Sequence, residues 1–96
     1  MKIEEKENIY NCIVIPNGDW EGFKVVANSI RTQLKINFKQ KVNDVDSYYW
    51  SFDFQGIEVN LHYHEMIGDV ELFVNKDKSN DIKLGVLLED LKNDLK

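Results

Sequence analysis

Hydrophobic and polar residues alternate over three consecutive segments in the second half of the chain, and this is its strongest pattern. The alternation runs through residues 48–55, 57–64 and 70–75, with breaks at Gly56 and Gly68. A period of two predicts β-strands that each have one apolar face, and short breaks predict tight turns. We therefore expect three consecutive strands joined as an antiparallel meander.

The turns set the register that we expect between these strands. If Gln55-Gly56 is a two-residue hairpin loop, Trp50 faces Leu61, and every pair on that side is apolar or aromatic. With Ile67-Gly68 as the second loop, Leu61 faces Val74 on the same side. A one-residue slip would expose the whole apolar set to water, so the register should be well specified.

Two further segments have the spacing of amphipathic helices, with apolar residues recurring every three or four positions. Asn17 or Asp19 can cap the first helix, and Ser79, Asn80 or Asp81 can cap the second. The expected buried stripes are Trp20, Phe23, Val26, Ala27, Ile30 and Leu34 in the first helix, and Leu84, Leu87, Leu88, Leu91 and Leu95 in the second.

Two other segments are candidate strands. Residues 9–15 (IYNCIVI) are nearly all apolar and stop at Pro16-Asn17-Gly18, which predicts an inner strand followed by a turn. In residues 36–42, Ile36, Phe38, Gln40 and Val42 alternate with other residues, as in an edge strand guarded by lysines. The first helix could equally continue into this segment, so both interpretations stay open.

These elements predict one α+β domain over residues 1–96, since a chain of 96 residues has room for a single domain. The predicted order is β-α-(β)-β-β-β-α. Two amphipathic helices and one apolar sheet face predict a two-layer sandwich with an antiparallel sheet and both helices on one face. The position of strand 9–15 within the sheet is left open.

The sheet face turned away from the helices is the candidate binding surface. In the expected register Tyr49, His62 and Phe73 form one row, His64 and Glu71 form the next, and Asp53 faces Glu58. Like charges directly opposite each other destabilise a sheet mildly, so stability alone would not favour them. An ordinary solvated face is the alternative. The candidate partner-binding residues are Tyr49, Asp53, Glu58, His62, His64, Glu71 and Phe73.

The charge of the chain limits its partners. A net charge of −5 argues against binding to nucleic acids or anionic membranes, because phosphates require Lys and Arg. It favours a basic protein partner, or serves only solubility. No stretch approaches the ~20 apolar residues of a membrane span. The charged start at residues 1–8 is unlike a secretory leader, so we expect a cytoplasmic protein.

Catalytic and metal chemistry find little support in the sequence. His62 and His64 share a strand face, and Glu71 could be a third metal ligand or an acid–base partner of His64. A surface histidine pair that titrates near neutral pH is the preferred interpretation, with no metal and no cofactor. Cys12 lies in the most apolar strand and should be an inert core residue. No nucleophile, phosphate loop or oxyanion arrangement is recognisable, so we do not expect an enzyme.

The predicted layout and the segment YYWSFDFQGIEVNLHYHEMIGDVELFV resemble small bacterial α+β proteins, and also immunity proteins of contact-dependent growth inhibition and related polymorphic toxin systems. The resemblance implies a cytoplasmic inhibitor that plugs the active site of a cognate toxin domain, often a basic nuclease. An acidic and aromatic surface suits this task, because charge complementarity speeds association and aromatic residues anchor the complex. The alternative is a small structural or adaptor module, for example a homodimer, and the oligomeric state is left open.

Overall fold

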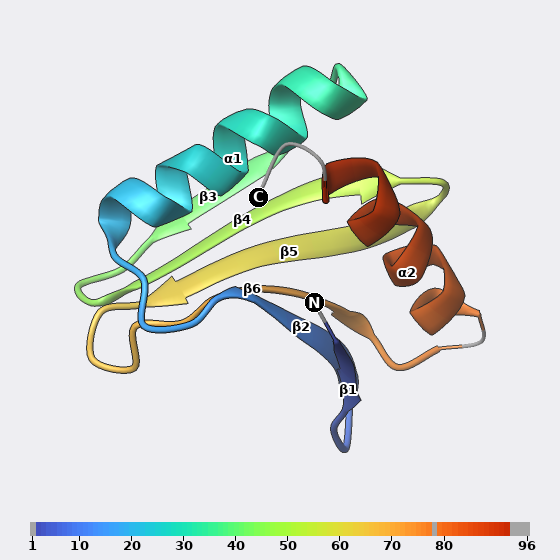
Figure 1. Cartoon of the computed structure of the whole chain (residues 1–96), viewed down its shortest axis with the longest axis horizontal. Helices are drawn as coiled ribbons and strands as arrows, with labels where there is room; N and C mark the ends of the chain where they lie inside the picture. The colour runs from blue at the N-terminus through green and yellow to red at the C-terminus, as the bar shows by residue number, and fades with distance from the viewer. Residues whose placement is uncertain (1, 78, 93–96) are drawn as a thin grey trace.

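The computed structural model describes residues 2–77 and 79–92, which form one sheet with two helices on one of its faces (Figure 1). The described strands follow the spatial order β1-β2-β6-β5-β4-β3, and all neighbours are antiparallel. The predicted α+β two-layer sandwich is therefore confirmed. In chain order the elements are β1 (Ile3–Glu5), β2 (Ile9–Ile15), α1 (Trp20–Leu34), β3 (Gln40–Asn43), β4 (Ser47–Phe54), β5 (Ile57–His64), β6 (Val70–Asn75) and α2 (Asn80–Leu91).

The hairpin between β4 and β5 has the predicted register. Trp50 pairs with Leu61. The connecting residues Gln55 and Gly56 have φ angles of 50° and 83°. Two consecutive positive φ angles belong to the tight turn whose twist matches that of paired strands, and glycine adopts this conformation without steric cost. The turn therefore fixes which residues of β4 and β5 lie opposite each other.

The register between β5 and β6 was predicted wrongly. Leu61 pairs with Leu72 and not with Val74. The reason is the length of the connecting loop, which spans residues 65–69 and not only the predicted Ile67-Gly68. Within this loop the Gly68 N–H donates to the His64 carbonyl at 2.7 Å. The error is two residues long, so every side chain keeps its predicted face but meets different neighbours.

Strand β1 was not predicted. It pairs with β2 and places Ile3 opposite Cys12, but a three-residue strand with one apolar side chain has no readable period. Its presence puts β2 between β1 and β6, so the predicted inner position of residues 9–15 is confirmed.

The segment after α1 differs from both interpretations of residues 36–42. The helix ends at Leu34, because Lys35 has a left-handed backbone (φ 54°) that cannot continue it. A strand forms only at Gln40–Asn43. Phe38 packs against the core ahead of this strand, whereas Val42 lies opposite Tyr49 on the other side of the sheet. Ile36, Phe38, Gln40 and Val42 were expected to share one face. Ile36 and Phe38 instead pack against the core, whereas Gln40 and Val42 lie on the other face of the sheet.

Both helices present the predicted stripes to the sheet. The Asp19 carboxylate caps α1 by accepting from the Gly22 N–H at 2.8 Å. Ser79 is the N-cap residue of α2, but its side chain makes no capping hydrogen bond. Leu95, expected in the second stripe, lies outside the described residues. The fully or nearly buried apolar helix residues are Phe23, Val26, Ala27, Ile30, Leu84, Leu87, Leu88 and Leu91.

The core lies between these stripes and the apolar face of the sheet. Phe52, Leu61 and Leu72 have no exposed surface. An aromatic cluster joins α1 to β4, where the Phe23 ring meets the Trp50 ring edge-on with centroids 4.9 Å apart. Within the described residues, no helix is long and apolar enough to cross a bilayer.

Replacing Phe52 by Ala should destabilise the fold by about 3–5 kcal/mol, because it leaves a cavity in a fully buried layer. Urea denaturation followed by circular dichroism measures the loss. Val45→Ala is the control: Val45 is 90% exposed, and a surface change of this kind should stay within about 0.5 kcal/mol. Equal effects of the two substitutions would contradict the proposed core.

Candidate functional site

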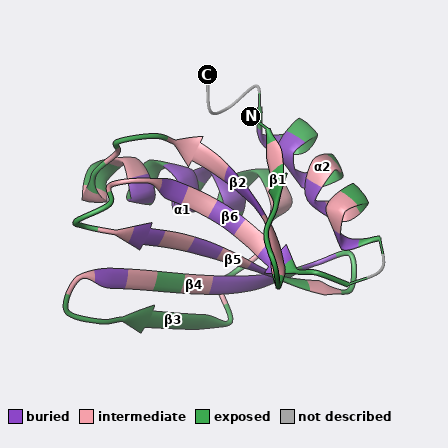
Figure 2. Ribbon diagram, turned by 90° about the horizontal axis from the view of Figure 1, so that it is seen from below, coloured by how far each residue is buried: buried purple, intermediate pink, exposed green. Residues whose placement is uncertain are grey.

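The outer face is the side of the sheet turned away from both helices. In the view from below, the strands lie in front and α1 lies behind them (Figure 2). Strand pairing defines two central rows across this face. One row contains Val42, Tyr49, His62, Glu71 and Ile13, and the other contains Gln40, Ser51, Asn60, Phe73 and Asn11.

The predicted site residues fall on the outer face, but two of the predicted rows are wrong. Tyr49 lies opposite His62 as expected, yet the next residue in that row is Glu71 and not Phe73, which lies opposite Asn60. The predicted row of His64 and Glu71 does not form. These differences follow from the two-residue change in the register of β6, which moves its side chains along the sheet.

His62 is at the centre of this face and is held from several directions. The Tyr49 ring stacks on the imidazole with centroids 4.3 Å apart, and the Phe73 ring meets it edge-on at 6.3 Å. His62 Nδ1 lies 3.1 Å from Glu71 Oε1, and Asn11 Nδ2 donates to Glu71 Oε2 at 3.1 Å. We call Asn11, Tyr49, His62, Glu71 and Phe73 the His62 cluster.

The hydrogen bonds of Glu71 favour the ionised form of its carboxyl group. The hydrogen bond from His62 lowers the pKa of Glu71 below its ordinary value of 4.5, and the bond from Asn11 adds to this against the opposing effect of burial. An ionised carboxylate only accepts hydrogen bonds, so Nδ1 of His62 must carry the hydrogen. In the neutral ring, Nε2 is then an acceptor.

Three buried polar atoms on the outer face have no hydrogen-bond partner among the described residues. They are Asn11 Oδ1, Ser51 Oγ and His62 Nε2. Asn11 and Ser51 are only 4% and 3% exposed. Buried polar atoms are normally paired with protein or water, so each of these exceptions needs a physical explanation. The sequence analysis did not select Asn11, although an amide within the apolar run of residues 9–15 was a signal.

The acidic row at one end of the face is partly neutralised, contrary to our expectation. Asp53 lies opposite Glu58 as predicted. However, Lys39 Nζ lies 2.8 Å from Asp53 Oδ1 and 3.5 Å from Glu58 Oε2. The hydrogen bond to Asp53 raises the pKa of Lys39. The facing carboxylates therefore share a basic partner within the fold, so the expectation that stability alone would not favour this pair is wrong.

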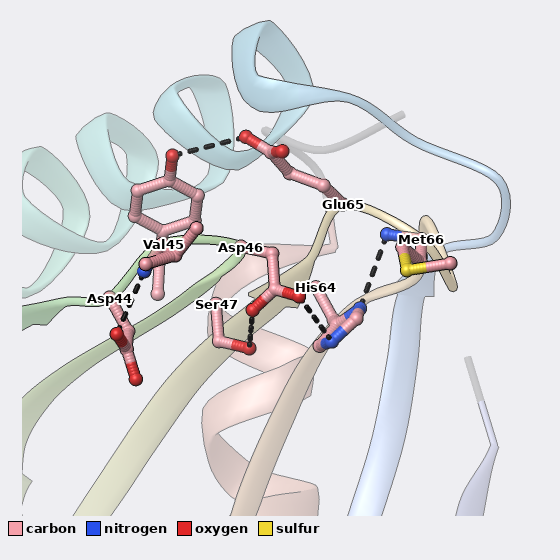
Figure 3. A network of polar contacts seen from close by, with 8 residues as sticks. Asp44, Val45, Asp46, Ser47, His64, Glu65 and Met66 are labelled. Atoms are coloured by element: carbon pink, nitrogen blue, oxygen red, sulfur yellow. Dashed lines mark hydrogen bonds and ion pairs between the residues drawn. The ribbon is translucent and has the colours of Figure 1, made fainter.

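Unneutralised acidic residues lie at the other end of the face, near the turns that join β3 to β4 and β5 to β6. We call Asp44, Asp46 and Glu65 the acidic turn cluster (Figure 3). Asp44 accepts from the Val45 N–H, and the Tyr48 hydroxyl donates to Glu65. Within the described chain, none of the three pairs with Lys or Arg.

His64 belongs to this end of the face and not to the His62 cluster. Its Nε2 lies 3.5 Å from Asp46 Oδ2, and the Met66 N–H donates to its Nδ1 at 3.2 Å (Figure 3). The two histidines thus bond to different carboxylates, and the suggested pair of His64 with Glu71 is wrong. Across the residues described, no group of three or more His, Cys, Asp or Glu side chains could hold a metal ion.

Cys12 lies on the helix side of the sheet and is fully buried. Burial raises the pKa of its thiol. A protonated and inaccessible thiol is a poor nucleophile, so the predicted core role of Cys12 agrees with its environment.

Comparison with known proteins identifies a family for this chain. Residues 1–91 match the model of a family described as protein of unknown function (DUF3630). No curated protein and no solved structure matches the chain.

Replacing Glu71 by Gln should destabilise the protein at pH 7 by about 1–3 kcal/mol, because two hydrogen bonds to a charged group are lost or weakened. The lowered pKa of Glu71 means that its contribution is present above its ordinary pKa of 4.5 and is lost as pH falls through the folded value. The difference between wild type and variant should therefore shrink at pH 3 in urea denaturation.

Glu89→Gln is the matched control for this measurement. Glu89 forms an exposed ion pair with Lys92 on α2, and its replacement should change stability by less than about 0.5 kcal/mol. A Glu71→Gln effect that stayed constant between pH 7 and pH 3 would rule out the assigned ionisation.

Proposed function

The chain belongs to the DUF3630 family of proteins of unknown function, and we propose that it acts by binding another protein through its outer face, as an inhibitor of the immunity type. The observation that carries the proposal is the His62 cluster. It combines aromatic rings, a polar network and unpaired buried atoms on the sheet face opposite the helices.

The aromatic rings of the cluster suit the centre of a protein interface. Tyr49 is 39% exposed and stacks on His62, which fixes its orientation before a partner arrives. Tyrosine provides a large contact area with few rotatable bonds, and binding energy commonly concentrates in such residues at the centre of an interface. A partner that covered Tyr49 and Phe73 would bury both without first reorganising the sheet.

The charge at the border of this face favours a basic partner. The acidic turn cluster places carboxylates there, and the whole chain has a net charge of −5. Lys and Arg side chains of a basic domain would supply complementary charge.

The inhibitor role extends this binding proposal. A rigid sheet face that binds a basic domain can cover the groove in which that domain holds its own anionic substrate, which is how an immunity protein would neutralise a nuclease-type toxin in the cytoplasm. The proposal assigns no catalytic step to the chain.

A photo-crosslinking amino acid at position 49 should trap one basic protein when the variant is expressed in the native host. Val86 is the matched control position, because it is 39% exposed like Tyr49 but lies on α2, on the other side of the sheet. Crosslinked products identified by mass spectrometry should appear for position 49 and be absent for position 86.

The trapped protein is then purified, and its activity is measured with and without this chain. Inhibition by the wild type that is weakened at least ~10-fold by Tyr49→Ala would support the proposal. A crosslink between two copies of this chain would point to the homodimer alternative instead. Equal crosslinking at both positions would remove the outer face as the binding surface.

A further inference from the structure

A second candidate site lies on the helix side of the sheet, apart from the outer face. It is a hollow of about 220 Å³ between α1 and the sheet edge formed by β3 and β4. Figure 1 shows α1 running along this edge. The hollow is lined by Lys24, Ala27, Asn28 and Arg31 of α1, and by Phe38, Lys41 and Trp50 from the sheet edge and the segment before it.

The charge of this hollow is opposite to that of the chain. Its lining contains three basic side chains and no Asp or Glu, although the whole chain has a net charge of −5. Lys24 pairs with Glu21 at 2.9 Å. Arg31 and Lys41, by contrast, form no ion pair with any carboxylate in the part of the chain that the structure describes.

The unpaired cations are held in place by neutral groups. Lys41 Nζ lies 4.4 Å from the centroid of the Trp50 ring, and Arg31 Nη2 donates to Asn28 Oδ1 at 3.3 Å. A cation over an aromatic ring is stabilised without losing its charge. Both cations therefore remain available to an anion that enters the hollow.

The floor of the hollow is aromatic and positioned by the fold. The Trp50 indole N–H donates to Asn43 Oδ1 at 2.9 Å, which fixes the plane of the ring. Phe38 meets Trp50 edge-on with centroids 5.4 Å apart. Flat apolar rings beside cations suit a ligand that is itself flat and apolar on one side and anionic on the other.

We propose that this hollow binds a small planar anion, an aromatic ring that carries a carboxylate or phosphate group. Arg31 and Lys41 contact the anionic group, for which the guanidinium offers two parallel hydrogen bonds. The ring packs beside Trp50 and Phe38. A volume of about 220 Å³ is smaller than typical drug-sized pockets, so it limits the ligand to about one ring with its anionic group.

This site is independent of the proposed protein-binding function. Trp50 and Tyr49 are neighbours on β4, and successive side chains of a strand point to opposite faces. Loss of one site therefore need not affect the other, and each can be tested alone.

The test is a titration of the ¹⁵N-labelled wild-type protein with phenyl phosphate, followed by NMR. The indole N–H signal of Trp50 and the amide signals of Arg31 and Lys41 should shift and saturate, with a Kd on the order of 1 mM. Inorganic phosphate and phenol are titrated separately. Each should bind at least ~10-fold more weakly than phenyl phosphate, because inorganic phosphate lacks the ring and phenol lacks the anionic group.

Arg31→Gln and Lys41→Gln should each weaken phenyl phosphate binding by roughly 10-fold, because each removes one charge-assisted contact. Lys76→Gln is the matched control: this lysine also lies over an aromatic ring, 6.0 Å from the Tyr10 centroid, but it is distant from the hollow and pairs with Glu5. Its replacement should leave binding unchanged. Circular dichroism confirms that each variant is folded.

The proposal would be overturned by the absence of saturable shifts up to ~10 mM phenyl phosphate. Equal weakening by Lys76→Gln would show a response to total charge alone. Binding of inorganic phosphate or of phenol as tight as that of phenyl phosphate would also reject a site for a ring that carries an anion.

Discussion

Burial of one sheet face under two helices is the constraint on which the rest of this structure depends. Phe52, Leu61 and Leu72 are fully buried on that face, and α1 and α2 contribute Phe23, Ile30 and four leucines to the same core. Because side chains alternate along each strand, the same packing sends Tyr49, His62 and Phe73 to the opposite side. Packing of the core therefore determines which side chains lie on the outer face. The geometry of both proposed sites depends on this packing.

The two proposed sites differ in charge and in the kind of contact that they offer. The outer face joins stacked rings to a hydrogen-bonded carboxylate and is bordered by acidic turns. The hollow beside α1 joins two rings to Arg31 and Lys41, which have no carboxylate partner among the described residues. The chain is acidic as a whole, but this hollow is basic. The two proposed ligands, a basic protein and a small anion, would therefore bind at different places on the molecule. Strand β4 contributes neighbouring residues to both.

The facing carboxylates of the outer face could not be interpreted before their neighbours in space were known. Asp53 and Glu58 face each other, and in isolation this pair would be mildly destabilising. Lys39, which comes from the segment between α1 and β3, bonds to both carboxylates. The acidic border of the face lies instead at the turns that contain Asp44, Asp46 and Glu65, where the described chain supplies no Lys or Arg partner and His64 is the basic side chain that lies beside Asp46.

The sequence by itself determined the two helices, the meander, the apolar face and the hairpin at Gln55-Gly56, because all of these depend on local periodicity and local turn geometry. The alternation also assigned the site residues to the outer face, since a register error of two residues leaves each side chain on its own face. Only the tertiary structure decided which residues meet there. The five-residue loop before β6 placed Glu71 beside His62, the backbone at Lys35 ended α1 and freed Lys39 to reach Asp53, and the packing of α1 along β3 and β4 formed the hollow. These contacts join residues far apart in the chain, so no local pattern records them.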